Sequence, residues 1–414
     1  MVECISGKTL LIISGGTEAV PGIKHAKKMG LYVVVSDGDE NAPGFNYADD
    51  KIIASTYNVD DTIQKVKYYH NNIRKINGVI CIASDVPLTV ASVSKTLNLP
   101  SIPIESAMLS INKLSMKDKF RVSNIPIPDY KQVNDLNHLY EIIKDWGYPL
   151  VIKPVDSRGA RGVLRLVKDI DLNWAYNHSI ENSPSHTVMV EKFLSGPQIS
   201  TEAIIVDGIG YPIGFSDRNY EMLEEFSPYI IENGGGFPSK LSVNDQLSVS
   251  NMAINAGLSL GVKNGICKGD MVFTKNGPMV IEVALRLSGG WFSTDQIPLG
   301  LGVDLIGSAI KLAIGEKIET NELIPKYNKG VAVRYFFPKP GIVKEIINEK
   351  KYMNVKWVHK IGFFVKPGDL IKDVTNHTKR AGFVITVGRT QALAVERALE
   401  VIDTVNIKTE PIFS

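Results

Sequence analysis

The stretch Lys268 to Gly290 reads KGDMVFTKNGPMVIEVALRLSGG, and it decides how the whole chain is interpreted. Apolar and polar residues alternate on both sides of Asn276-Gly277, a strong signal for a tight turn, so the stretch predicts a half-buried β-hairpin. In that hairpin Asp270 and Glu282 face each other. Two carboxylates held this close repel unless a cation lies between them, so the pair predicts a site for a hard divalent cation with oxygen ligands.

The residues that follow the hairpin favour an anionic ligand. Arg286 comes four residues after Glu282, and a Ser288-Gly289-Gly290 turn comes next. The planar fork of an arginine suits phosphate or carboxylate oxygens. The alternative is an edge hairpin with two solvated acids, and the arginine and the glycine turn argue against it.

Composition limits the classes of protein to consider. The chain has 414 residues, of which 44% are hydrophobic and 22% charged, enough for two or three cores. Its 46 basic and 44 acidic residues nearly balance, so no charge pattern predicts a nucleic-acid or membrane partner. Cys4, Cys81 and Cys267 are widely spaced, as reduced core thiols would be. With no leader pattern and no apolar run of roughly twenty residues, we expect a cytoplasmic protein.

The first hundred residues alternate strands and helices. Strands are predicted at 9–13, 32–35 and 78–82, with a helix at 20–29, which indicates a doubly wound parallel sheet whose strand ends line a ligand crevice. The loop at 15–17 superficially resembles a dinucleotide fingerprint, but its spacing is not G-x-G-x-x-G. A tight strand-to-helix turn is therefore favoured over a nicotinamide or flavin site, and capture of a small anion stays open.

A second glycine-containing loop lies near the middle of the chain. A helical segment at 110–123 ends at an Ile-Pro-Ile-Pro linker, and a strand at 148–154 carries Lys153. The loop DSRGARGV at 156–163 follows. Glycine lets backbone amides approach a phosphate, and a lysine on the strand beneath adds a point charge. A plain hairpin turn is the alternative.

Four motifs follow one another in order: Asn112-Lys113-Leu114 with Lys117, Val151-Ile152-Lys153-Pro154 with its glycine loop, Val190 to Gly196 (VEKFLSG), and the hairpin from Asp270 to Gly290. Together they resemble the ATP-grasp superfamily of carboxylate-activating ligases, which includes biotin carboxylase, purine-pathway ligases, D-alanine ligase and L-amino acid ligases. The resemblance covers essentially the whole chain.

The resemblance implies an α/β fold in three parts. An N-terminal, Rossmann-like domain with a doubly wound parallel sheet would occupy residues 1–105. An ATP-grasp domain of two α+β subdomains would occupy 106–328. A C-terminal α+β lobe would occupy 329–414, with strands at 331–336 and 382–387 and an amphipathic helix at 390–405. We expect this lobe to complete the acceptor site.

The resemblance also implies which residues bind ATP. Lys113 and Lys153 would contact ATP, with Lys117 as a less certain helper, and the backbone of Lys192 and Leu194 would pair with the adenine edge. Gln198 stands where relatives have a ribose-binding acid, so that contact is expected to be weaker or to pass to Glu202. The expected nucleotide-binding set is Lys113, Lys153, Ser157, Arg158, Gly159, Ala160, Glu191, Lys192, Phe193, Leu194, Gln198 and Glu202.

Asp270 and Glu282 would hold Mg²⁺, with Mn²⁺ as an alternative ion. Most relatives carry an asparagine two residues after the second acid, and this chain has Ala284, so we expect one metal to be loosely held. Arg286 would bridge the transferring phosphate and the substrate carboxylate. The expected catalytic set is Arg286, Lys153, Ser288 and Gly289.

The resemblance implies an ATP-dependent carboxylate-amine ligase that forms an amide or peptide bond through an acyl phosphate and releases ADP and phosphate. Its partners would be a small carboxylate and an amine, and we expect a homodimer. Ala284 also favours a bicarbonate-using enzyme of the purine carboxylase or carbamoyl-phosphate type. Gln198 and Ala284 together leave open a non-catalytic nucleotide-binding protein, and a dehydrogenase is the most distant alternative.

The sequence says least about the part of the site that would bind the acceptor amine. The segment 217–239 resembles the loop before the final metal strand in amino acid ligases, with Gly235 where a histidine is often seen. Trp291 and Phe292 either wall a substrate pocket or belong to the core.

Overall fold

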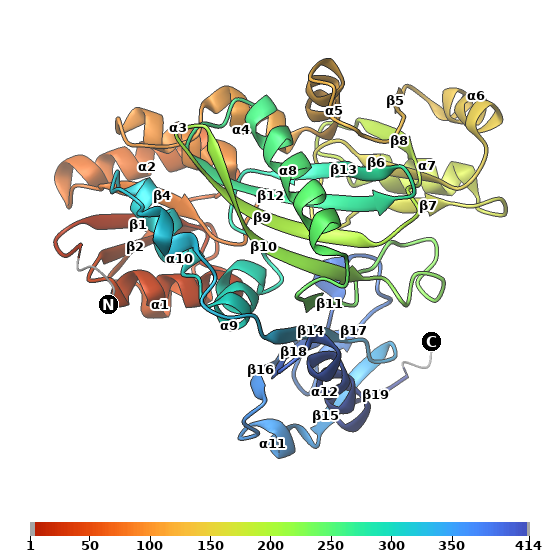
Figure 1. The fold of residues 1–414 in the computed structure, drawn as a ribbon. Helices are drawn as coiled ribbons and strands as arrows, with labels where there is room; N and C mark the ends of the chain where they lie inside the picture. The colour runs from red at the N-terminus through yellow and green to blue at the C-terminus, as the bar shows by residue number, and fades with distance from the viewer. Residues whose placement is uncertain (1–4, 412–414) are drawn as a thin grey trace.

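The computed structural model describes residues 5–411, and four β-sheets organise them (Figure 1). Cys4 lies outside the described residues. Figure 1 shows the N-terminal and central sheets above a C-terminal lobe. The mixed α/β fold predicted from the sequence is confirmed.

The N-terminal sheet is parallel throughout. Its strand order is β3 (Asp50–Ile53), β2 (Tyr32–Asp37), β1 (Thr9–Ile13) and β4 (Gly78–Cys81). Helices α1 (Val20–Lys28) and α10 (Leu305–Ala313) share one apolar core with this sheet, and α2 (Val59–Asn72) and α3 (Pro87–Thr96) share the other. Helices on both faces make the sheet doubly wound, as predicted.

A small antiparallel sheet carries the second glycine loop. Its order is β5 (Tyr130–Val133), β8 (Val188–Lys192), β6 (Leu150–Pro154) and β7 (Leu164–Leu166). Helices α6 (Leu136–Trp146) and α7 (Leu172–Glu181) cover it with side chains such as Leu139 and Ala175, both fully buried. The loop between β6 and β7 is the predicted DSRGARGV segment.

An antiparallel sheet of eight strands runs through the middle of the molecule and into the C-terminal lobe. Its order is β13 (Gly277–Ala284), β12 (Gly265–Thr274), β9 (Gln198–Val206), β10 (Ile209–Asn219), β11 (Gly234–Phe237), β14 (Gly330–Phe336), β18 (Gly382–Gly388) and β16 (Val358–Phe363). Helix α8 (Val243–Ser259) packs on its first half through Val249, Ala253 and Ala256. The pairing of β11 with β14 joins the two halves.

Helix α12 (Gln391–Thr404) packs on the C-terminal half of this sheet through Ala394, Ala398 and Val401, as its amphipathic spacing predicts. A three-stranded sheet of β17 (Leu370–Ile371), β15 (Gly341–Ile347) and β19 (Asn406–Glu410) completes the lobe. The shorter elements are η1 (Thr17–Ala19), η2 (Pro43–Tyr47), η3 (Phe292–Gln296), α9 (Ile297–Leu301), η4 (Thr320–Leu323), α11 (Glu349–Tyr352) and η5 (His377–Lys379).

The helical segment predicted at 110–123 is interrupted at Asn112. The structure has two helices there, α4 (Ile104–Ile111) and α5 (Lys113–Val122). Asn112 separates them because its backbone is extended and its side chain accepts a hydrogen bond from the backbone N–H of Ser115. An asparagine that caps the second helix in this way starts that helix rather than continuing the first.

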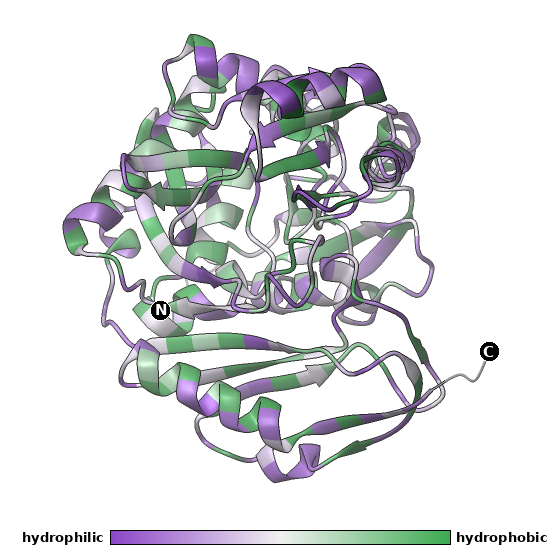
Figure 2. Ribbon diagram, turned by 90° about the vertical axis from the view of Figure 1, so that its right-hand side faces the viewer, coloured by the Kyte–Doolittle hydropathy of each residue, from purple (hydrophilic) through white to green (hydrophobic). Residues whose placement is uncertain are grey.

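Apolar side chains gather where the sheets and helices meet. Figure 2 shows the strands in alternating hydrophobic and hydrophilic bands, as expected when one face of a sheet is covered. Cys81 and Cys267 are buried free thiols within these cores. Among residues 5–411, no helix combines the length and apolar character that a membrane crossing requires.

Candidate active site

A cavity of about 590 Å³ lies where the parallel sheet, the small sheet, the eight-stranded sheet and the C-terminal lobe meet. Its walls carry most of the residues that the sequence singled out. These are Lys113, Lys153, Ser157, Arg158, Gly159, Ala160, Glu191, Lys192, Phe193, Leu194, Gln198, Asp270, Glu282, Arg286, Ser288 and Gly289. The fold therefore brings together motifs that lie more than 150 residues apart.

The predicted hairpin is formed by β12 and β13, and it forms one wall of the cavity. Asp270 and Glu282 are direct cross-strand partners, as the sequence predicted. Asp270 is buried, and Glu282 lies partly open to the cavity. Burial alone would raise the pKa of Asp270, but Arg218 and Lys268 hold that pKa below its ordinary value. The pKa of Glu282 is likewise lowered against the effect of burial, mainly by Lys113.

A buried cluster of two lysines and one glutamate supports the opposite wall. Lys153 contacts one carboxylate oxygen of Glu191, and the Lys117 Nζ lies 2.9 Å from the other. Lys117 also donates to the Ile281 carbonyl at 3.1 Å, so it ties the small sheet to the hairpin. Lys117 does not line the cavity, whereas Lys153 does. Burial lowers the pKa of Lys117 to about 8.

We expect Glu191→Gln to lower the free energy of unfolding by about 3–5 kcal/mol, because it leaves two buried ammonium groups without their anion. Chemical denaturation measures this loss, with the exposed Glu141→Gln as the control. Because the pKa of Lys117 is about 8 when folded and higher when unfolded, the unfolded chain binds more protons between these values. The variant lacks Glu191, which raises this pKa, so Lys117 should lose its proton at a lower pH and the stability of the variant should begin to rise with pH below 8. An unchanged denaturation midpoint would contradict the assignment.

The glycine loop between β6 and β7 is anchored from three sides. The Lys113 Nζ donates to the Ser157 carbonyl at 2.7 Å, and the Arg158 guanidinium lies 4.5 Å from the Tyr57 ring of the N-terminal domain. On the third side, the His377 backbone N–H of the C-terminal lobe donates to the Gly159 carbonyl at 3.1 Å. Gly159 has φ +63°, which favours glycine. The loop thus meets both flanking domains.

Arg286 is directed by an acid from the N-terminal sheet. Its Nε donates to Asp85 at 2.7 Å, and its terminal nitrogen lies 2.5 Å from the same carboxylate. The Arg286 side chain is only 13% exposed, so the pair is not a surface salt bridge. Asp85 follows β4, the strand whose end was predicted to line the crevice, and it also faces the cavity. No local pattern in the sequence pairs these two residues, which are 201 positions apart.

The turn after Arg286 is held by two acids, the buried Glu202 and the half-buried Glu18. The Ser288 N–H donates to Glu202 at 2.8 Å, and the Gly290 N–H donates to Glu18 at 2.7 Å. The backbone amides of Ser288 and Gly290 in the turn predicted to favour an anion are therefore already engaged. The Ser288 Oγ, in contrast, is buried without a hydrogen-bond partner among the described residues. A side chain added at Gly289 would come within 2.8 Å of Glu18, so this position favours glycine.

Glu202 does not belong to the nucleotide-binding set. It is fully buried, does not line the cavity, and accepts hydrogen bonds from Ser288 and from the Ser293 hydroxyl at 2.7 Å. Its carboxylate is directed at the glycine turn, so it cannot reach a ribose. Gln198 does line the cavity.

Trp291 and Phe292, the aromatic pair after the turn, have different roles: one belongs to the core and the other lines the cavity. Trp291 is buried in the core and stacks on Phe383 with ring centroids 4.5 Å apart. Phe292 is one of the residues that line the cavity, and Gly235 lines it as well.

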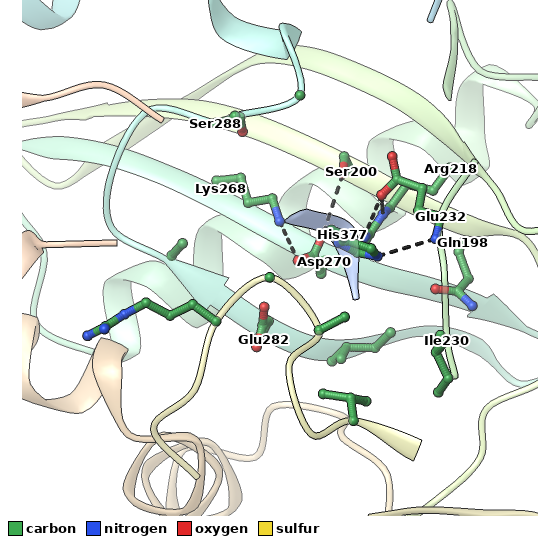
Figure 3. Close-up of a pocket in the computed structure, with 18 of the residues that line it drawn as sticks. Gln198, Ser200, Arg218, Ile230, Glu232, Lys268, Asp270, Glu282, Ser288 and His377 are labelled. Carbon is green, nitrogen blue, oxygen red and sulfur yellow. Dashed lines mark hydrogen bonds and ion pairs between the residues drawn. The ribbon is translucent and has the colours of Figure 1, made fainter. Parts of the chain in front are cut away.

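Several charged residues of the cavity were missed by sequence reasoning. Arg218 on β10 contacts Asp270 and Glu232, both at 2.7 Å, and Figure 3 shows these side chains pointing toward one another. His377 accepts from the Glu232 backbone N–H at 3.2 Å, and Arg380 lies 3.8 Å from the Tyr335 ring. The period-2 spacing of Lys268 and Asp270 could have revealed Lys268, but no local pattern pairs Arg218 with Asp270.

Comparison with known families agrees with this arrangement. Residues 112–321 match the family described as the carbamoyl-phosphate synthase L chain, ATP binding domain, and residues 334–410 match the L-amino acid ligase C-terminal domain 2. The first match covers half of the chain. The chain belongs to this ATP-binding family and is therefore a member of the ATP-grasp ligases, as the motifs predicted.

Individual relatives are distant. An uncharacterized protein, y4rH of Sinorhizobium fredii, is 27% identical over 79% of this chain and 68% of its own length. Dapdiamide A synthase of Enterobacter agglomerans is 21% identical over 62% of this chain, and D-alanine–D-alanine ligase of Trichlorobacter lovleyi is 26% identical over 44%. The matches span 61% and 58% of these two enzymes.

Solved structures share the fold over nearly the whole chain. L-amino acid ligase from Bacillus licheniformis superposes with a TM-score of 0.81 at 18% identity, covering 98% of this chain and all of that one. Phosphoribosylglycinamide synthetase from Anaerococcus prevotii superposes with a TM-score of 0.75 at 21% identity, covering 97% and 100%. Both likenesses show the architecture.

Proposed function

We propose that the protein is an ATP-dependent ligase that joins a small carboxylic acid to an amine through an acyl phosphate. The observation that carries this proposal is the composition of one cavity. Lys113, Lys153 and the glycine loop form one wall, and the facing carboxylates Asp270 and Glu282, followed by Arg286, form the other. Such an arrangement neutralises a triphosphate next to a group that binds a carboxylate.

Adenine would lie in the part of the cavity lined by Val151, Phe193, Leu194 and Val272. The Lys192 backbone N–H already donates to the Asp129 carbonyl at 3.0 Å. The Lys192 carbonyl, and not its N–H, would therefore pair with adenine by accepting a hydrogen bond from the exocyclic amine. Gln198, at the cavity wall, would contact the ribose with an amide instead of a charge.

The carboxylate pair fits a divalent cation. Asp270 and Glu282 supply hard oxygen donors from adjacent strands, and Mg²⁺ or Mn²⁺ prefers such donors. A bound ion would neutralise charge on the nucleotide phosphates. The residues proposed to hold it are Asp270 and Glu282, of which Glu282 is the more open and would make the direct contact.

In the first chemical step, an oxygen of the substrate carboxylate would attack the terminal phosphorus of ATP, and ADP would leave. Arg286 would orient the carboxylate and the transferring phosphoryl group, because Asp85 already fixes the direction of its guanidinium. Lys113 and Lys153 would stabilise the charge on the phosphate oxygens. The buried Ser288 hydroxyl, which has no partner in the described residues, would donate to the acyl phosphate.

In the second step, an amine would displace phosphate from the acyl phosphate and form the amide. The C-terminal lobe faces this end of the cavity with Tyr335, His377 and Arg380. The match of residues 334–410 to an L-amino acid ligase domain supports an amino acid as one substrate, and the likeness to dapdiamide A synthase supports amide formation. We also propose that the division 1–105, 106–328 and 329–414 describes the functional domains.

We expect phosphate and ADP to be released when the protein is mixed with ATP, Mg²⁺ and a panel of amino acids and other small acids. Hydroxylamine should trap the acyl phosphate of the correct acid as a hydroxamate, before the natural amine is known. Coloured hydroxamate and released ADP measure this step. ADP release without hydroxamate across a broad acid panel would contradict the proposal.

A bicarbonate-using enzyme is the second candidate, because Ala284 extends the resemblance to purine-pathway ligases, some of which carry an alanine at this position. It predicts ATP turnover that depends on bicarbonate and needs no organic acid. The same assay in degassed, bicarbonate-free buffer separates the two reactions.

A further inference from the structure

We propose that the ammonium group of Lys268 takes the position of a second divalent cation, so that the protein binds ATP with one metal ion per site. This inference rests on the proposed nucleotide site and specifies how that site is charged. Lys268 already forms an ion pair with Asp270, one of the two facing acids.

The backbone places Lys268 on the same face of β12 as Asp270, two residues away. Its Nζ contacts the Asp270 Oδ2, and Figure 3 shows the lysine side chain extended toward that carboxylate. The cross-strand partner of Lys268 is Ala284, just as Glu282 is the partner of Asp270. The methyl group of Ala284 leaves the lysine room beside the acids, where an asparagine would introduce an amide oxygen.

Both oxygens of Asp270 already have partners, two of which carry a positive charge. Arg218 donates to the Oδ1 at 2.7 Å, the Ser200 hydroxyl donates to the same oxygen at 3.4 Å, and Lys268 contacts the Oδ2. Glu282 is more open, with the Lys113 Nζ 3.6 Å from its Oε2. Glu282 is therefore the side chain best able to accept one metal ion without displacing a cation.

The number of ligands also favours a single ion. Within residues 5–411, no group of three or more histidine, cysteine, aspartate or glutamate side chains is placed to hold a metal. Mg²⁺ requires near-octahedral oxygen coordination, so two ions would have to share two carboxylates, one of which is already neutralised. One ion bound by Glu282 and the nucleotide phosphates meets this requirement with fewer protein ligands.

The side-chain charges around the acids already balance. Three cations and three carboxylates make up the cluster: Lys113, Lys268 and Arg218 with Asp270, Glu282 and Glu232. A second divalent ion on Asp270 would lie beside the Lys268 ammonium and be repelled by it. Removal of this ammonium, together with restoration of an oxygen ligand at position 284, should open the second metal position.

The test counts metal ions directly. Mn²⁺ is titrated into an equimolar mixture of protein and a non-hydrolysable ATP analogue, and the electron paramagnetic resonance signal of free Mn²⁺ gives the number bound tightly. We expect one ion per wild-type complex and two for the double variant Lys268→Met/Ala284→Asn. Lys275→Met, in the exposed turn of the same hairpin, is the matched control and should bind one.

Two tight ions in the wild-type complex, or one in a double variant that still binds the nucleotide, would overturn the inference. If the double variant loses nucleotide binding, the wild-type count decides alone. The titration requires nucleotide binding but no catalysis, so a failure of the proposed ligase reaction would leave its result interpretable.

Discussion

Glu282→Gln is expected to lower the turnover number by about two to three orders of magnitude, as removal of a single preorganised electrostatic group does in other enzymes. Glutamine keeps the shape of the side chain and removes its charge. The affected group is the open carboxylate of the hairpin, which faces Asp270 and lies 3.6 Å from Lys113. Loss of this charge weakens the proposed metal contact. It also removes the negative charge that Glu282 places beside the Lys113 ammonium.

Steady-state ADP release measures this effect, with Glu396→Gln on the exposed side of α12 as the control. Nucleotide affinity, measured by calorimetry without turnover, should fall by less than about tenfold, because the lysines and the proposed adenine pocket remain. A variant that turns over like the wild type would remove Glu282 from the proposed site.

Arg286→Lys is expected to lower kcat/KM by about a hundredfold. Lysine retains one positive charge but cannot form the two-pronged contact that arginine makes with a planar anion. It also cannot bind Asp85 through two nitrogens, so the charge would no longer be aimed into the cavity. Both the binding and the alignment of the acid should suffer.

Hydroxamate formation at several acid concentrations separates the two contributions, because weaker binding raises KM and poor alignment lowers kcat. Arg389→Lys, at an exposed position before α12, should behave like the wild type. If Arg286→Lys kept the wild-type kcat/KM, the carboxylate would have to bind elsewhere in the cavity.

The local parts of this fold are predictable from the sequence because short-range patterns determine them. The alternation around Asn276-Gly277 is enough to place Asp270 opposite Glu282, and the apolar run 9–13 is enough to identify β1. The break between α4 and α5 at Asn112 was missed, because an asparagine within a helical pattern can lie inside one helix or cap the next. The folded chain shows that it caps α5.

The remainder of the site depends on contacts between distant segments. Arg218 reaches Asp270 across 52 positions, and Arg286 reaches Asp85 across 201. Neither pair shows a local periodicity, so only the folded chain reveals them. Glu202 was misplaced for the same reason, because its strand position does not indicate that its carboxylate points to Ser288.

The pairing of β11 with β14 has a practical consequence for protein engineering. A truncation at residue 329 would strip the glycine-rich strand Gly234–Phe237 of its neighbour and leave unsatisfied backbone groups along a new border. The C-terminal lobe, proposed above as a functional domain, therefore shares a sheet with the central region and is not a structurally separate unit. Chimeras made to exchange acceptor preference between relatives should therefore take β11 and β14 from the same parent. Their junctions should lie in loops outside the sheet.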